Sequence, residues 1–152
     1  MLTLTQRTIL LALTAFSTST MGQAGPNDSY RIQLTIQGAL IEGSQERAIR
    51  LVGRTPAEQE TILSEPLPTL TRGATFQLRV SITTPAGKTS DYTGSPRLRY
   101  EHFDCLSIAG TGVVTVRAGR ACNGPETPGL WIVLLSDLGE PIAYNEYLFA
   151  VQ

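Results

Sequence analysis

Apolar and polar side chains alternate along several stretches of this chain. The longest of these run from Tyr30 to Ile36 and from Phe76 to Ile82, and shorter ones begin at Leu98 and at Val114. A period of two sends successive side chains to opposite faces, so that one face can enter a core while the other meets water. These stretches therefore predict half-buried antiparallel strands.

The last third of the chain has a different pattern. Residues Leu130 to Leu135 are apolar at every position, which predicts a strand covered on both faces, and Ser136 to Glu140 turns the chain back into a strand from Ile142 to Val151. Turns rich in glycine and proline separate the segments. About seven to nine short strands with regular turns predict an all-β fold, an antiparallel β-sandwich.

One segment carries helical signals instead. Thr55 and Glu58 have the spacing of a capping box, and Pro56 stands where the first helical residue would be. The sequence therefore predicts one short helix over residues 56–63, which would act as a connector between strands.

The first 24 residues have the layout of a secretory signal peptide. A single positive charge, Arg7, precedes an apolar run from Thr8 to Phe16, and small residues follow at Gly22 and Ala24. The apolar run is much shorter than the ~20 residues that a membrane span needs. We expect cleavage after Ala24 and export to the periplasm, the cell surface or the medium, with no membrane span left after cleavage.

The remaining residues, 25–152, amount to a single domain with a formal net charge of −2. Basic residues do not form a run, which argues against a nucleic-acid partner. In an exported chain the only two cysteines, Cys105 and Cys122, most simply form a disulfide. Its loop would stabilise the fold by about 3 kcal/mol in the chain-entropy model. A metal pair or a reactive thiol is the competing interpretation, but no second pair of ligands lies nearby, so we expect no metal.

The segment YEHFDC, residues 100–105, gathers chemically active side chains. It holds the only histidine, His102, with Glu101 and Asp104 on either side. The strand period places Glu101 and His102 on opposite faces, and a catalytic triad depends on geometry that spacing cannot show. We expect a non-enzymatic protein without a cofactor. A hydrolase that uses Ser107, His102 and Asp104 is the second alternative.

Three aspartates stand near predicted turns: Asp91, Asp104 and Asp137. Loop carboxylates of this kind can bind calcium in surface modules. Aspartates in turns are more often turn formers, and we expect that role here.

Between residues 67 and 116 the chain resembles the bacterial immunoglobulin-like group 2 domains of intimin-type and invasin-type surface proteins. The matching stretches are LPTLTRGATFQLRVSI, GKTSDYTGSPRLRY and LSIAGTGVVTV. The resemblance implies an immunoglobulin-like sandwich over residues 25–152, in which residues 25–66 form an N-terminal extension or extra strands. The chain departs from the family pattern in having Tyr100 in place of a core tryptophan, an inserted AGRACNGPETPG segment and no tandem repeat.

These observations favour a binding or structural role through a protein partner at the cell surface or in an extracellular assembly. The candidate contact residues are the C-terminal aromatics Trp131, Tyr144 and Tyr147, unless residues 30–36 or the helix cover them. The first alternative is a secreted or periplasmic inhibitor that presents the disulfide-closed loop between Cys105 and Cys122.

Overall fold

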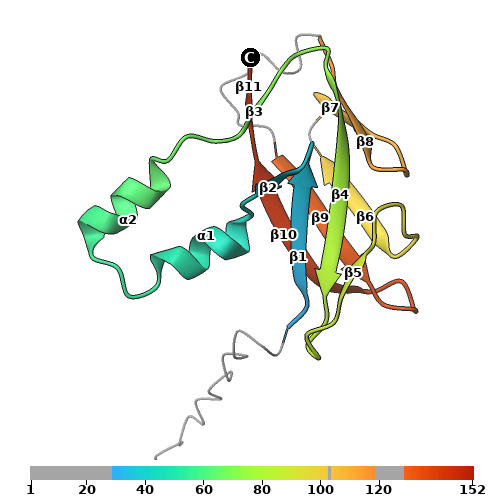
Figure 1. Cartoon of the computed structure of the whole chain (residues 1–152), viewed down its shortest axis with the longest axis horizontal. Helices are drawn as coiled ribbons and strands as arrows, with labels where there is room; N and C mark the ends of the chain where they lie inside the picture. The colour runs from blue at the N-terminus through green and yellow to red at the C-terminus, as the bar shows by residue number, and fades with distance from the viewer. Residues whose placement is uncertain (1–28, 103, 119–128) are drawn as a thin grey trace, which may run out of the picture.

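The computed structural model describes residues 29–102, 104–118 and 129–152 (Figure 1). Two layers of β-sheet pack face to face, and a pair of helices projects from one side of them. The elements in chain order are β1 (Arg31–Ile36), β2 (Ala39–Ile41), α1 (Ser44–Leu51), α2 (Pro56–Leu63), β3 (Thr69–Leu70), β4 (Thr75–Thr83), β5 (Thr89–Asp91), β6 (Leu98–His102), β7 (Leu106–Ile108), β8 (Val113–Val116), β9 (Gly129–Leu135), β10 (Pro141–Leu148) and β11 (Ala150–Val151).

The first sheet has the strand order β2-β1-β4-β8-β7, and β5 pairs with β4 beside this path. All its pairings are antiparallel, and β1 faces β4 along its whole length, with Leu34 opposite Val80. The second sheet has the order β10-β9-β6, also antiparallel. A short parallel pair, β3 with β11, ties the C-terminus to the segment that leads into β4.

The core lies between the two sheets and is made by alternate residues of the strands. Its completely buried side chains include Ile32, Leu34, Leu78, Val80, Ile82, Leu130, Ile132 and Leu134. The alternation in β1 and β4 therefore points inward as the sequence predicted, and the prediction of an antiparallel all-β sandwich is confirmed. In β9 even an outward residue, Val133, is only 7% exposed, so this strand is largely covered.

The two helices form an arm inserted between β2 and β3, which we call the helical arm (residues 44–63). The predicted helix is confirmed as α2, with the Thr55 side chain accepting from the Glu58 N–H and Pro56 in the first turn. Helix α1 was not predicted, and none of its residues is buried. In the described residues no helix is long and apolar enough to cross a membrane.

Candidate contact surface

Helix α1 pairs its charged side chains with other residues of this chain and exposes its apolar side to water. Ile49 is 61% exposed, and Val52, directly after the last turn, is 78% exposed. Together with Gln45 and Ala48, which are also exposed, they have the i, i+3, i+4, i+7 spacing of one helical stripe. A helix on a protein surface normally buries this kind of stripe against its own core. In α1 this stripe is exposed to solvent.

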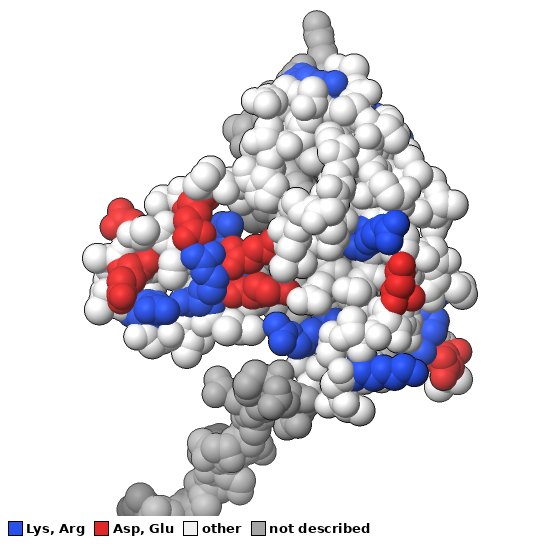
Figure 2. Space-filling view, viewed as in Figure 1, with Lys and Arg blue, Asp and Glu red and all other residues white. Residues whose placement is uncertain are grey.

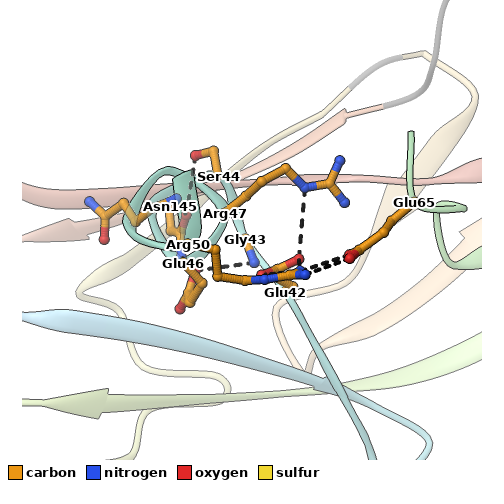
Figure 3. Close-up of polar contacts among 9 residues, drawn as sticks. Glu42, Gly43, Ser44, Glu46, Arg47, Arg50, Glu65 and Asn145 are labelled. Carbon is orange, nitrogen blue, oxygen red and sulfur yellow. Dashed lines mark hydrogen bonds and ion pairs between the residues drawn. The ribbon is translucent and has the colours of Figure 1, made fainter. Parts of the chain in front are cut away.

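The charged side of α1 makes an ion-pair network with the chain on both sides of it. Arg50 binds both carboxylate oxygens of Glu42 at 3.0 Å and reaches Glu65 at 2.7 Å, and Arg47 lies 3.7 Å from Glu42 (Figure 3). Hydrogen bonds to Glu65 and Glu42 raise the pKa of Arg50, and the Arg50 bond lowers the pKa of Glu65. Figure 2 shows acidic and basic side chains intermingled on this face of the arm. The network connects the segment before α1, the last turn of α1 and the segment that follows α2.

The first turn of α1 is capped by a residue from a distant strand. The N-cap position is Gly43, which has no side chain with which to cap the helix. Asn145 of β10 supplies the missing acceptor, because its Oδ1 accepts from the Gln45 N–H at 3.2 Å and from the Ser44 hydroxyl at 3.3 Å. Its Nδ2 donates to the Glu46 carboxylate at 2.8 Å. The helix is thereby capped by a side chain that is distant in the sequence, and it is joined to the second sheet.

Gly43 is needed at the N-cap because Asn145 packs directly against its Cα. A Cβ at this position would lie 2.4 Å from the Asn145 Nδ2, far inside normal contact distance. The Gly43 N–H is satisfied by Glu46, whose carboxylate accepts it at 3.1 Å. Gly43 and the buried Asn145 amide therefore pack together where the helical arm leaves the sandwich.

The same asparagine reaches into the space between the sheets. Asn145 is completely buried, and its Nδ2 contacts the Ile32 carbonyl at 3.3 Å and the Tyr147 hydroxyl at 3.2 Å. The Tyr147 hydroxyl donates to the same Ile32 carbonyl at 2.9 Å. Burial raises the pKa of Tyr147 well above its usual value. This buried cluster links β1, β10 and α1, so it sets the position of the arm on the sandwich.

A shallow groove of about 440 Å³ lies where the arm meets the sandwich. One wall is Gln45 of α1, whose Nε2 donates to the Tyr144 carbonyl at 2.7 Å. The lining residues are Ser29, Tyr30, Gln45, Pro141, Ile142, Ala143 and Tyr144, and none of them is charged. Because Gln45 belongs to both the groove and the α1 stripe, the two join into one area. We call this area the contact surface: the groove residues together with Ala48, Ile49 and Val52.

The three aromatic residues predicted as contacts do not share one face of the second sheet. Trp131 and Tyr144 point away from the core on the outer face of the second sheet, where Trp131 is half-buried and Tyr144 is 61% exposed. Tyr147 has the opposite parity in β10 and is completely buried. Of the three, only Tyr144 belongs to the contact surface. The Tyr147 hydroxyl instead makes hydrogen bonds within the core.

The residues of the alternative catalytic set are spread along an exposed stretch. His102 ends β6, Asp104 lies in the following turn and Ser107 lies in β7, and all three are exposed. The expectation of a non-enzymatic protein stays a prediction.

The predicted disulfide falls partly outside the described residues. Cys105 is buried and 3% exposed, whereas Cys122 lies in the segment that the structure does not describe. The predicted inhibitory loop extends into the same segment. Both remain predictions.

The three aspartates weighed as calcium ligands do not meet. Asp91 accepts the Thr93 N–H at 2.8 Å, and this bond lowers its pKa. Asp137 lies 3.5 Å from Arg97. Among residues 29–102, 104–118 and 129–152 no three histidine, cysteine, aspartate or glutamate side chains gather as metal ligands would.

Several residues of the contact surface escaped sequence reasoning. Ile49 and Val52 have a helical spacing, but Gly43 gives no capping signal, so the helix that carries them went unrecognised. Ile142 was predicted only as part of a strand. No protein-family model and no curated protein matches the chain.

Proposed function

We propose that this chain is an exported, non-enzymatic immunoglobulin-like module that binds a protein partner through the contact surface. The observation that carries the proposal is that α1 exposes Ile49 and Val52 to solvent while its charged residues pair with other residues of this chain. Exposing an apolar stripe to water is unfavourable, and burial against a partner recovers that free energy.

The strand order supports the immunoglobulin-like part of the proposal. Leaving aside the short strands β2 and β5, one layer has the order β1-β4-β8-β7 and the other has the order β6-β9-β10. Lettered in chain order, these orders match the A-B-E-D and C-F-G arrangement of a seven-strand immunoglobulin-like sandwich, which supports this part of the proposal. The helical arm is then an insertion after the first strand, placed at one side of the sandwich where a partner can reach it (Figure 1).

The size of the exposed apolar area supports a protein ligand. Val52, Ile49 and Ile142 are 78%, 61% and 40% exposed, and Tyr144 is 61% exposed. With ordinary side-chain areas these four contribute about 300 Å² of apolar surface. Apolar patches of ~300–600 Å² are often functional, and a standard interface buries ~800 Å² on each partner, rather more than half of it apolar. The patch is thus large enough for the centre of an interface.

The chemistry of the surface indicates the chemistry of the partner. None of the described residues that line the groove is charged, and the charges of α1 are engaged with Glu42, Glu65 and Asn145. A charged segment would lose hydration without gaining an ion pair. We infer that the partner presents an uncharged apolar segment, with Tyr144 and Ile142 packing against it.

The experiment is site-specific photo-crosslinking in the native cell. A photoreactive phenylalanine analogue is placed at Ile49, and a matched one is placed at Leu138, an apolar residue in the β9–β10 turn that is 88% exposed. We expect one discrete adduct from position 49 and none from position 138. The adduct is identified by mass spectrometry, and its affinity is then measured with purified components.

The binding measurement uses the Ile49→Glu and Leu138→Glu variants. Burying the new carboxylate in an apolar contact weakens binding at least tenfold for Ile49→Glu, while Leu138→Glu binds as the unaltered protein does. Both positions are exposed, so both variants keep the melting temperature of the parent. Equal binding by the two variants, or the same adducts from both positions, would refute the proposed surface.

A further inference from the structure

The second sheet has two edges, and among the described residues the pairing and covering contacts of the two edges differ. The edge at β10 is covered by the first turn of α1, since Gln45 donates to the Tyr144 carbonyl and the Ser44 hydroxyl accepts from the Glu146 N–H at 3.4 Å. At the other edge, β6 pairs with β9 on one side, and no described strand pairs with its other side. At five residues β6 is also longer than β2, β5 or β7, which have three each. An open strand edge is a template for pairing with another chain.

The backbone groups on the open side of β6 can be assigned from one hydrogen bond. The Leu135 N–H donates to the Arg97 carbonyl at 2.8 Å, so Arg97 faces β9. By alternation Arg99 and Glu101 also direct their backbone groups toward β9, and Tyr100 directs its N–H and C=O to the open side. The centre of the open edge is therefore Tyr100.

The side chains of this edge carry charges of opposite sign. Arg99 and Glu101 lie on the outer face of the sheet, half exposed, and their side chains form an ion pair at 2.9 Å. Charged residues on an edge strand ordinarily oppose pairing with an unrelated strand. They favour pairing when the incoming strand presents the opposite charge at each position.

A second copy of β6 presents the required charges. In an antiparallel pair with Tyr100 opposite Tyr100, position 99 of one copy lies opposite position 101 of the other. Arg99 then faces Glu101 of the second copy, and Glu101 of the first copy faces Arg99 of the second. We propose that β6 pairs with β6 of a second copy of this chain across a two-fold axis at Tyr100.

The geometry of the pair follows from antiparallel pairing. The Tyr100 N–H of each copy donates to the Tyr100 carbonyl of the other, so the two three-stranded sheets become one. Arg99 and Glu101 occupy the non-hydrogen-bonded positions, where opposed side chains come closest, with Cβ atoms ~5 Å apart. Because the contact is the same patch on both copies, it closes as a dimer and does not extend into a fibre.

A five-residue strand is a small contact, ~17 Å long, so the dimer forms at micromolar rather than nanomolar concentration. The proposal does not depend on the proposed function, because the contact surface lies beside β10, at the opposite edge of the sheet. A dimer through β6 leaves both contact surfaces open.

The test is sedimentation velocity of the exported chain over about 1–200 µM, a range that brackets the affinity of small interfaces. We expect a reversible monomer–dimer equilibrium. Arg99→Glu places like charges opposite each other at both symmetric positions and weakens the dimer about ten- to a hundredfold, as does Glu101→Arg. The double variant Arg99→Glu with Glu101→Arg restores the opposite charges and the dimer.

The double variant is the matched control, since it contains both substitutions and keeps the ion pair within each copy. A second readout is hydrogen exchange at the Tyr100 amide, which slows as the protein concentration rises. A monomer throughout the range, a dimer that both single reversals leave intact, or a dimer that Ile49→Glu abolishes would each overturn the proposal. Circular dichroism confirms that every variant is folded.

Discussion

Replacing Asn145 with alanine tests whether one buried amide holds the helical arm on the sandwich. The side chain is completely buried and contacts Gln45, Ser44 and Glu46 of the arm and the Ile32 carbonyl of β1. Alanine removes the acceptor that caps α1 and the donor that binds Glu46. It also leaves a small cavity against Gly43.

The magnitude can be estimated from the separate losses. Removal of a helix cap costs about 1 kcal/mol, and leaving buried polar partners without a bond costs about 1–3 kcal/mol. The Ile32 carbonyl keeps its bond from Tyr147, and the Glu46 carboxylate keeps the Gly43 N–H and can reach water, which limits the second loss. We expect the free energy of unfolding to fall by about 3 kcal/mol, or the melting temperature to fall by roughly 10 °C.

Two measurements separate the local effect from the global one. Urea unfolding gives the free energy, and hydrogen exchange gives the protection of the α1 amides, which should drop by more than that of the β4 amides. Glu146→Ala is the control, since this neighbour in β10 points its side chain to the outer face. A loss below 1 kcal/mol for Asn145→Ala, with exchange in α1 unchanged, would refute the role assigned to the amide.

Two further predictions concern the core and one turn. Burial raises the pKa of Tyr147, so the folded state holds this proton more tightly than the unfolded state, whose tyrosines titrate near pH 10. This contribution to the free energy of unfolding is complete below about pH 10 and is lost as pH rises further. Tyr147→Phe should therefore make the loss of stability above about pH 10, measured by urea unfolding, smaller. An unchanged fall of the free energy of unfolding with pH would contradict this prediction. Gly112 has φ +82°, and a Cβ there would lie 2.8 Å from the Thr93 methyl and 2.9 Å from the Leu78 carbonyl oxygen. Gly112→Ala should therefore lower the free energy of unfolding, measured by thermal unfolding, by about 2 kcal/mol. Gly110→Ala is the control and should have almost no effect, because a Cβ at Gly110 would have open space around it.

The two proposed contacts lie at opposite edges of the β10-β9-β6 sheet. If both form, a dimer through β6 carries one contact surface on each copy and can bind two partner molecules at once. Two linked sites bind a surface that displays several partner molecules far more tightly than one site does, because the second binding event is intramolecular. This arrangement suits a small protein whose proposed contact surface is modest in area.

Local patterns along the chain predicted much of the sandwich. The alternation in β1 and β4 identified their buried faces, because a period of two is a direct consequence of strand geometry. Helix α2 was predicted because its cap is local, with Thr55 and Glu58 three residues apart. Helix α1 was missed because its cap comes from Asn145, about a hundred residues away.

The sequence by itself determined which faces of β1 and β4 enter the core and where the short capped helix begins. Only the tertiary structure decided which way α1 faces, since its charges find partners in Glu42, Glu65 and Asn145. It also decided that Tyr144 reaches solvent while Tyr147 does not, and that α1 covers one edge of the second sheet while no described strand pairs with the outer side of β6. Strand and cap signals act between neighbours in the chain, whereas exposure and edge pairing depend on segments that meet only after folding.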